Sequence, residues 1–298
     1  MKRFFACVLA AMLLLSLCAC GGSANQATEP VETTQPLPAA PKTLKVLAVG
    51  NSFSVDAMTY LYQVAKAEGV EDVVLGNFFV GACTLKMHAG YMESGEAAYR
   101  YDKCSDGTWV QTPNTTLLTG LLDEQWDVIT LQQASHDSGL ANTYQPYLDE
   151  LVAYVQEKCP NAKLMWHMTW AYQSDSDHKA FPTYGNEQMT MYYGIINAVQ
   201  KNIDTNANFV KTIPSGTMIQ NLRGSVIGDR LTRDGYHLND MGRLAAAYTW
   251  YAVLAEQNLQ DMKFSNTGKT ALDRQQIDLI IKSINAALEK PQGVTPIK

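Results

Sequence analysis

Five short apolar runs constrain the fold of this 298-residue chain more than any other feature. Each run is nearly continuous rather than alternating, which is typical of parallel strands buried on both faces of a sheet. The runs span residues 46–49, 73–80, 128–131, 164–168 and 209–213, and apolar residues at helical spacing recur over 58–65, 147–155, 189–199, 244–254 and 272–288. This alternation predicts a three-layer α/β/α sandwich around a central parallel sheet of about five strands.

The pattern extends over one long domain. Hydrophobic residues make up 46% of the chain, enough for a core of ordinary size, which excludes a fully disordered protein. No internal repeat or shift in composition marks a second domain, so we expect one domain over 44–290 and a tail over 291–298. Residues 84–125 combine glycines, Pro113 and mixed polar residues, and we interpret them as a long excursion between the second and third strands.

The N-terminus has the pattern of a signal peptide. Lys2 and Arg3 precede an apolar stretch that ends near Leu17 and is too short to span a membrane. The following Cys18-Ala19-Cys20 resembles a bacterial lipobox, which predicts a signal peptide over 1–19 and a lipidated Cys20. An ordinary secretory signal with incidental cysteines is the alternative.

Residues 20–43 are rich in Pro, Thr and Ala and show no apolar periodicity, so we expect an extended tether. Three cysteines lie beyond it, Cys83, Cys104 and Cys159, which allow one disulfide at most. We favour free thiols, and no Cys or His spacing suggests a zinc site.

The charge distribution argues against a nucleic-acid partner. The formal net charge is −6 at pH 7, and no run of basic residues stands out. A nucleic-acid binder would show a basic patch or stripe.

Polar residues follow several of the predicted strands, where ligands bind in open α/β sheets. Gly50-Asn51-Ser52 follows the first strand, Gly81 the second, and Gln132-Gln133 the third. Ser52 opens a helix, whose N-terminal N–H groups favour a developing oxyanion, and the glycine would let a substrate oxygen approach a backbone N–H. Asp234 and His237 stand three residues apart before the helix at 244–254, so the carboxylate can orient the imidazole.

These residues resemble the conserved blocks of the SGNH (GDSL-like) hydrolase superfamily over about residues 44–258. Gly50-Asn51-Ser52-Phe53-Ser54 looks like its first block, Gly81 matches the second, and Asp234 with His237 matches the Asp-x-x-His of the fifth. The likeness is greatest to a bacterial lipoprotein branch of unknown function related to carbohydrate acetylesterases. The resemblance implies a flavodoxin-like fold and ester hydrolysis with Ser52 as nucleophile, His237 as general base and acid, and Asp234 as its orienter.

The third block departs from the superfamily, which usually has Gly-x-Asn-Asp there. Leu131-Gln132-Gln133-Ala134-Ser135 is similar instead to the Gln-Gly-Glu-Ser of carbohydrate acetylesterase relatives. A glutamine amide can donate to an oxyanion as an asparagine does. We therefore expect oxyanion donors from Ser52, Gly81 and either Gln132 or Gln133, with Gln132 preferred.

Four further residues are candidates for substrate binding: Asn51, His136, Trp170 and Tyr172. Trp170 and Tyr172 could stack on a sugar ring, although we favour packing in the core and at its rim for them. His136 could line the pocket or lie in a surface loop.

These patterns predict a lipid-anchored serine esterase on the outer side of a bacterial cell membrane, which removes acetyl or other short acyl groups from carbohydrate. The alternative is a catalytically weak or inactive glycan- or solute-binding lipoprotein on the same fold, which the atypical third block favours. We expect a monomer that needs no metal or cofactor, with an acylated carbohydrate or other small ester as substrate and Cys20 as its link to the membrane.

Overall fold

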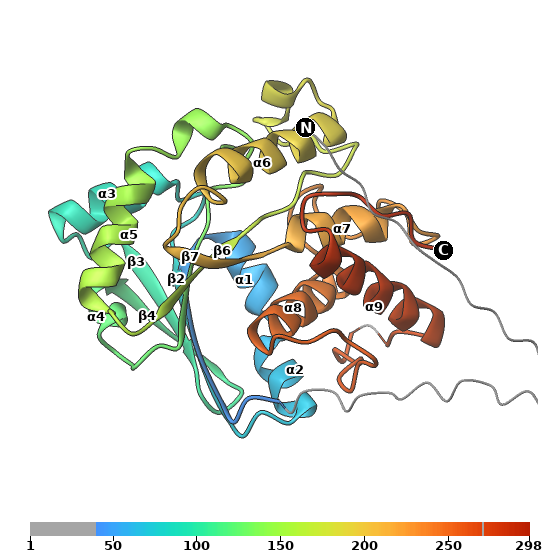
Figure 1. Cartoon of the computed structure of the whole chain (residues 1–298), viewed down its shortest axis with the longest axis horizontal. Helices are drawn as coiled ribbons and strands as arrows, with labels where there is room; N and C mark the ends of the chain where they lie inside the picture. Colours follow the sequence, from blue (N-terminus) through green and yellow to red (C-terminus); the bar gives the residue numbers. More distant parts are fainter. Residues whose placement is uncertain (1–39, 270) are drawn as a thin grey trace, which may run out of the picture. The chain divides into compact units, whose positions relative to one another are not determined.

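The computed structural model describes residues 40–269 and 271–298 and has one mixed sheet at its centre. The strand order is β4-β3-β2-β1-β5-β6-β7 (Figure 1). The strands are β1 (Thr43–Gly50), β2 (Asp72–Phe79), β3 (Tyr99–Cys104), β4 (Trp109–Thr115), β5 (Val128–Leu131), β6 (Lys163–His167) and β7 (Phe209–Ile213). The signal peptide, Cys20 and all but the last four residues of the tether lie outside the described residues.

Five strands form the parallel part of this sheet and correspond to the five apolar runs. β1 pairs in parallel with β2 on one side and with β5 on the other, and β6 and β7 extend the sheet beyond β5. The α/β fold with a central parallel sheet is therefore confirmed.

The sheet is larger than predicted because residues 84–125 add an antiparallel hairpin. β3 pairs with β2, and β4 pairs with β3 at the sheet edge. This hairpin turns the supposed excursion into two further strands next to β2.

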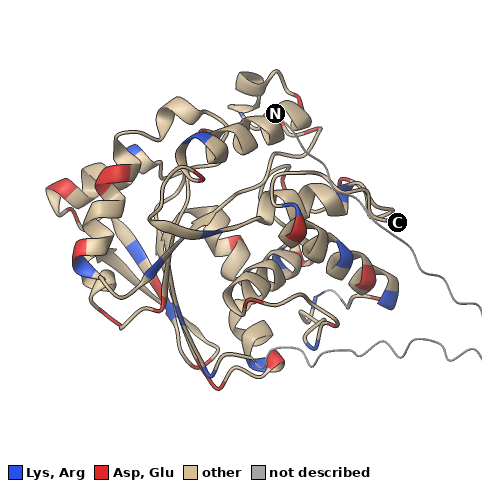
Figure 2. Ribbon diagram, viewed as in Figure 1, with Lys and Arg blue, Asp and Glu red and all other residues tan. Residues whose placement is uncertain are grey.

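Helices cover both faces of the sheet (Figure 1). The helices are α1 (Ser52–Met58), α2 (Leu61–Glu68), α3 (Leu85–Ser94), α4 (Leu117–Leu121), α5 (Tyr147–Lys158), α6 (Gln188–Asn202), α7 (Ser215–Arg223), α8 (Asp240–Leu254) and α9 (Arg274–Glu289), with short 3₁₀ turns η1 (Ala141–Thr143) and η2 (Phe181–Tyr184). α1, α2, α7, α8 and α9 pack together in one layer, α3, α4 and α5 in another, and α6 packs against η1 and η2. Figure 2 shows acidic and basic positions interspersed over these helices.

The boundaries of the site-bearing helices follow from capping. The Asn51 side chain accepts a hydrogen bond from Phe53 N at the start of α1, and Asn239 accepts one from Gly242 N at the start of α8. Gly69 ends α2 with a φ of 107°, a left-handed conformation that glycine adopts without strain.

The tail over 291–298 packs against α7, since Thr295 N donates to Asn221 Oδ1 and Ile297 is buried. All three described cysteines are free thiols, as favoured by the sequence. No helix within residues 40–269 and 271–298 combines the length and apolarity needed to cross a membrane.

Candidate active site

The site lies where the direction of strand addition reverses. The chain passes from β1 to β2 on one side, and after the hairpin it returns to β5 on the other side of β1. The carboxyl end of β1 is therefore a topological switch point, the usual place for a ligand crevice in open α/β sheets. Ser52 follows β1 directly and is the first residue of α1.

The structure brings Ser52, His237 and Asp234 together, although the serine and the histidine lie 185 residues apart in the sequence. Ser52 Oγ lies 2.8 Å from His237 Nε2, and His237 Nδ1 lies 2.7 Å from Asp234 Oδ2. With the Nδ1 proton directed at the carboxylate, Nε2 is free to accept the serine proton. This is the order of contacts that a serine nucleophile, its base and an orienting acid require.

Asp234 is held as a carboxylate by the loop it belongs to. Its other oxygen accepts hydrogen bonds from the backbone N–H groups of His237, at 2.8 Å, and Tyr236, at 3.3 Å. Burial raises the pKa of Asp234, but the bonds from the His237 ring and from these backbone groups outweigh it, so that the pKa lies below its usual value. The carboxylate can therefore stabilise an imidazolium on His237.

Asp56, which the sequence analysis missed, ties this loop to α1. Its buried carboxylate accepts from Leu238 N at 2.8 Å, from Arg233 Nη1 at 3.1 Å and from Arg243 Nε at 2.8 Å. Because Leu238 adjoins His237 and Asp56 lies one turn after Ser52, these bonds fix the imidazole relative to the hydroxyl. The only signal in the sequence is an acidic residue within the apolar run of α1.

Gln132 does not lie open to the site as predicted. It is buried, its Nε2 donates to Asn51 Oδ1 at 2.9 Å, and its Oε1 lies 2.8 Å from His167 Nδ1. His167 Nε2 in turn lies 3.2 Å from Ser215 Oγ. Gln132 thus belongs to a buried chain of hydrogen bonds that supports Asn51, the capping residue before Ser52.

Gln133 is also committed elsewhere. Its Oε1 accepts from the backbone N–H groups of Leu85 and Ala134, both at 2.9 Å, and its Nε2 donates to Thr143. The sequence analysis expected one of the two glutamine amides to face an oxyanion, and the structure instead buries both because each bonds within the protein.

The two predicted backbone donors, Ser52 N and Gly81 N, remain candidates for an oxyanion. Ser52 N is the first N–H of α1, and the first N–H groups of a helix have no partner within it. Gly81 is exposed just beyond β2, and an added Cβ would meet nothing within 4 Å. A substrate oxygen therefore has open access to the backbone at Gly81.

The other candidate binding residues are mostly internal. Trp170 is fully buried, stacks on Phe53 at 4.3 Å and donates through Nε1 to Tyr236 O. Tyr172 is fully buried and lies 3.0 Å from Ser135 Oγ through its hydroxyl. Both rings are buried and neither offers a face to a sugar, so they pack in the core, which was the favoured of the two alternatives. Asn51 is buried as the cap of α1.

A histidine that the sequence analysis did not select lies beside the loop that carries Asp234 and His237. His178 packs against Tyr236 at 4.7 Å and Tyr172 at 4.5 Å, and it is partly buried. Burial lowers its pKa, and electrostatic interactions with the nearby His136, Lys179 and His237 lower it further. His136 is partly exposed in this neighbourhood. Nothing in the local sequence of His178 distinguishes it from a surface residue.

The described residues contain no group of three or more His, Cys, Asp or Glu side chains arranged to hold a metal ion.

Comparison with solved structures finds several similar proteins. A DUF4886 family protein from Bacteroides uniformis is 40% identical, with a TM-score of 0.81 over 86% of this chain and 100% of that one. A family 3 carbohydrate esterase from Clostridium thermocellum has a TM-score of 0.42 at 16% identity over 72% of this chain and 98% of that one. A mutant of Axe2, an acetylxylan esterase from Geobacillus stearothermophilus, has a TM-score of 0.44 at 9% identity over 72% of this chain and 95% of that one.

Comparison with curated protein sequences found no match. The family model that matches covers residues 45–276, nearly the whole of the predicted domain, and describes a domain of unknown function. With that match and the similarity to the Bacteroides uniformis protein, the chain belongs to the DUF4886 family.

Proposed function

We propose that this protein is a serine esterase that removes acetyl or other short acyl groups from carbohydrate at the outer face of a bacterial membrane. The observation that carries the proposal is the continuous contact from Ser52 Oγ through the His237 ring to the Asp234 carboxylate. The N-terminal pattern that ends at Cys20 supports the location.

In the proposed acylation step, Ser52 Oγ attacks the ester carbonyl carbon while His237 Nε2 takes the serine proton. The carbonyl oxygen becomes an oxyanion and accepts hydrogen bonds from the backbone N–H groups of Ser52 and Gly81. Asp234 stabilises the imidazolium. The tetrahedral intermediate then collapses, the bond to the alcohol oxygen breaks, and His237 returns the proton to that oxygen, which leaves acyl-Ser52 and the free alcohol.

In the proposed deacylation step, water attacks the acyl-Ser52 carbonyl and gives its proton to His237 Nε2. The second tetrahedral intermediate breaks the bond to Ser52 Oγ, which regains the proton. The products are the carboxylic acid and the free enzyme, so the net reaction is ester hydrolysis.

Steady-state hydrolysis of 4-nitrophenyl acetate tests the proposal. Ser52→Ala and His237→Ala are each expected to lower kcat/KM by ~10³-fold or more, and the double variant should lose little beyond either one because the residues act as a unit. Ser94→Ala, at an exposed serine of α3, serves as the control and should keep the wild-type rate. Full hydrolysis by Ser52→Ala would contradict the proposal.

A second candidate is a weakly catalytic or inactive binding protein for acylated glycans. The observation that favours it is that the Gln132 and Gln133 amides are both bonded within the protein, which leaves fewer donors for an oxyanion. This candidate predicts that an acetylated sugar binds equally to the wild type and to Ser52→Ala, with no acetate released by either.

A further inference from the structure

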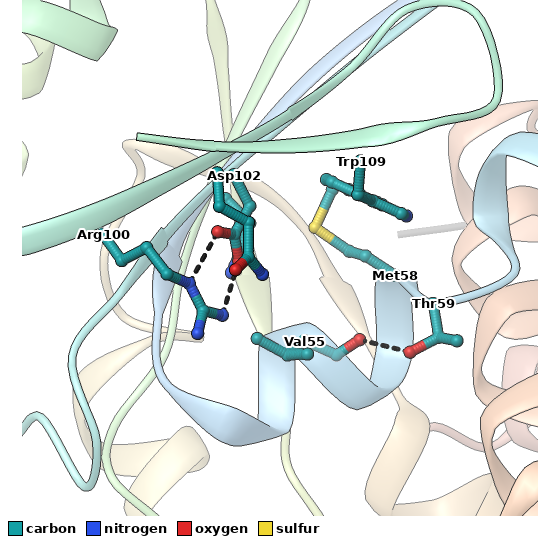
Figure 3. A pocket seen from close by; sticks show the side chains of 8 residues that line it. Val55, Met58, Thr59, Arg100, Asp102 and Trp109 are labelled. Atoms are coloured by element: carbon teal, nitrogen blue, oxygen red, sulfur yellow. Dashed lines mark hydrogen bonds and ion pairs between the residues drawn. The ribbon is translucent and has the colours of Figure 1, made fainter. Parts of the chain in front are cut away.

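A second pocket lies beside α1, between this helix and the β3–β4 hairpin (Figure 3). Its volume is about 180 Å³. An apolar cavity of roughly 150 Å³ is large enough to hold benzene, so this pocket has room for a six-membered ring. The sequence analysis selected none of the residues that form it as a site residue, and half of them lie on the hairpin that was not predicted.

The floor of the pocket is a row of polar side chains across three strands. Asn77 on β2 pairs with Asp102 on β3, and Asp102 pairs with Gln111 on β4. Directly opposed residues project on the same face of a sheet, here the face covered by α1. Asn77 and Asp102 are nearly buried, so the row offers a ligand hydroxyl a few hydrogen-bonding groups at the bottom of a mainly apolar pocket.

One of these groups is buried without a partner. Asn77 is 1% exposed, its Oδ1 accepts a 2.6 Å hydrogen bond from Ser54 Oγ, and its Nδ2 has no partner among the described residues. A buried amide donor left unpaired costs free energy, and such groups in native proteins call for an explanation. Since Asn77 lines the pocket, a ligand oxygen there would satisfy it.

The charged groups of the pocket cancel. Arg100 Nε and Nη2 donate to the two Asp102 oxygens, both at 2.7 Å, and the guanidinium lies 4.2 Å from the centre of the Phe79 ring. No other Lys, Arg, Asp or Glu lines the pocket. The fixed pair leaves each carboxylate oxygen a further lone pair for a hydroxyl, and the absence of net charge favours a neutral ligand over an anion.

The opposite wall is apolar. Val55 and Met58 project from α1, and Figure 3 shows the Met58 sulfur beside the Trp109 indole. Trp109 projects from β4 on the same face as Gln111, so an aromatic ring stands beside the polar row under the apolar side chains of α1. This combination matches a sugar ring, whose C–H face is apolar and whose rim carries hydroxyls. Small-molecule sites in general have mostly apolar walls and a small number of convergent polar groups.

The pocket and Ser52 share α1. At about 100° per helical residue, Val55, which lines the pocket, lies about 60° to one side of Ser52 around the helix, and Asp56 lies about 40° to the other. Asp56 holds the His237 loop, so this loop and the pocket lie toward different sides of α1. Arg100 also pairs with Phe79, two residues before Gly81, which places it near the proposed oxyanion donor.

We propose that this pocket binds the six-membered ring of a neutral sugar and acts as the carbohydrate subsite for ester cleavage at Ser52. Its role in catalysis rests on the proposed function, whereas its capacity to bind a sugar does not.

Binding is measured first, with the full-length chain in detergent and methyl β-D-xylopyranoside as the probe, by saturation-transfer NMR. The wild type and Ser52→Ala should both bind the glycoside. Trp109→Ala and Asn77→Asp should each weaken binding by about tenfold or more, because they remove the aromatic wall and the unpaired donor. Val110→Ala is the matched control, since Val110 lies between Trp109 and Gln111 on the other face of β4 and is 62% exposed.

Hydrolysis is measured second, with methyl 2,3,4-tri-O-acetyl-β-D-xylopyranoside and 4-nitrophenyl acetate. Trp109→Ala should lower the ratio of the two kcat/KM values by about tenfold, and Val110→Ala should leave the ratio at its wild-type value. Trp109 is only partly buried near the sheet edge, so this variant tests the pocket even if Asn77→Asp fails to fold.

The outcomes separate the two proposals. Sugar binding without Ser52-dependent hydrolysis supports the pocket and removes the esterase. Ser52-dependent hydrolysis with no glycoside binding by the wild type, or with equal binding by Trp109→Ala, overturns the sugar subsite. Trp109→Ala could instead change the preference between 4-nitrophenyl acetate and 4-nitrophenyl butyrate and leave the ratio of kcat/KM for the acetylated xyloside and 4-nitrophenyl acetate unchanged. That result would assign the pocket to an acyl chain and would also overturn the sugar subsite.

Discussion

Gln132 and Gln133 show why single residues of the site were harder to assign than the motif. Successive residues of an extended chain project to opposite sides, so one glutamine bonds to Asn51 and His167 and the other to α3 and Thr143. The sequence identifies amide groups at the end of β5 but does not show that other groups of the protein already bind them.

Gln132→Ala should therefore act through its neighbours. It removes a buried bond to the residue that caps α1 and leaves the His167 Nδ1 atom without its partner, so the free energy of unfolding should fall by about 1–3 kcal/mol. Kinetics and chemical denaturation of the same variant check this. A fall in kcat by ~10²–10³-fold in a variant of wild-type stability would instead restore Gln132 as an oxyanion donor.

Two buried histidines predict a dependence of stability on pH. Burial lowers the pKa of both His88 and His167 to about 3. Each imidazole stays neutral in the folded chain, whereas in the unfolded chain it takes up a proton below about pH 6.5. Their contribution to the free energy of unfolding is therefore complete above that pH and is lost as the pH falls toward 3.

Between pH 7 and pH 5, each of these histidines should lower the free energy of unfolding by about 2 kcal/mol. Denaturant unfolding of the wild type, His167→Gln and His88→Gln at the two pH values measures this. Each variant should show a correspondingly smaller fall than the wild type, and an unchanged fall in both would contradict the prediction.

At the scale of elements, α1 links Ser52, the proposed nucleophile, to the rest of the site. It carries Ser52 at its first position and Asp56 one turn later, and the bonds of Asp56 reach both Leu238 and the start of α8. Breaking a buried ion pair by removing one partner typically costs about 3–5 kcal/mol. The geometry between Ser52 and His237 should depend on this carboxylate.

Asp56→Asn is expected to lower kcat by tenfold or more with little change in KM, because a misplaced base slows the chemical step without removing substrate contacts. Asp240→Asn is the matched control, since Asp240 bonds to Tyr60 and contacts Arg243 at 3.8 Å but makes no bond to the His237 loop. Equal losses of kcat in the two variants would assign Asp56 a general structural role only.

The elements that could be predicted are those with strong periodicity. β7 spans the predicted residues 209–213, and the helices over 147–155 and 244–254 extend only a few residues further than predicted. β4 was not predicted because it is an exposed edge strand that contains Pro113 and mostly polar residues. Pro is tolerated at a sheet edge, where one side of the strand needs no ladder hydrogen bond. Asp102 and Arg100 lie on the same hairpin, so the second pocket could not be predicted either.

At the scale of the whole molecule, anchoring stays a prediction from residues outside those the structure describes. If Cys20 is lipidated, the full-length protein should partition with membranes and enter detergent, because two or more acyl chains anchor a protein stably. Cys20→Ser should be released or misprocessed. Equal partitioning of both proteins in a membrane fractionation would contradict the lipobox assignment.

The fold and the catalytic motif were predictable for different reasons. The parallel sheet follows from the apolar runs. The contact between Ser52 and His237 follows from topology, because the loop before α8 meets the carboxyl end of the central strand β1. No local pattern forces that meeting, and only the resemblance of the sequence blocks anticipated it.

The central claim is that Ser52 is a nucleophile activated by His237, and covalent labelling tests it most directly. The intact protein treated with a fluorophosphonate is expected to gain the mass of one phosphonyl group, located at Ser52 rather than Ser54 by fragmentation of the peptide that contains both. His237→Ala should label much more slowly, and Ser52→Ala should not label at all. A wild-type protein that gains no mass, or a Ser52→Ala variant that labels as fast as the wild type, would contradict the account.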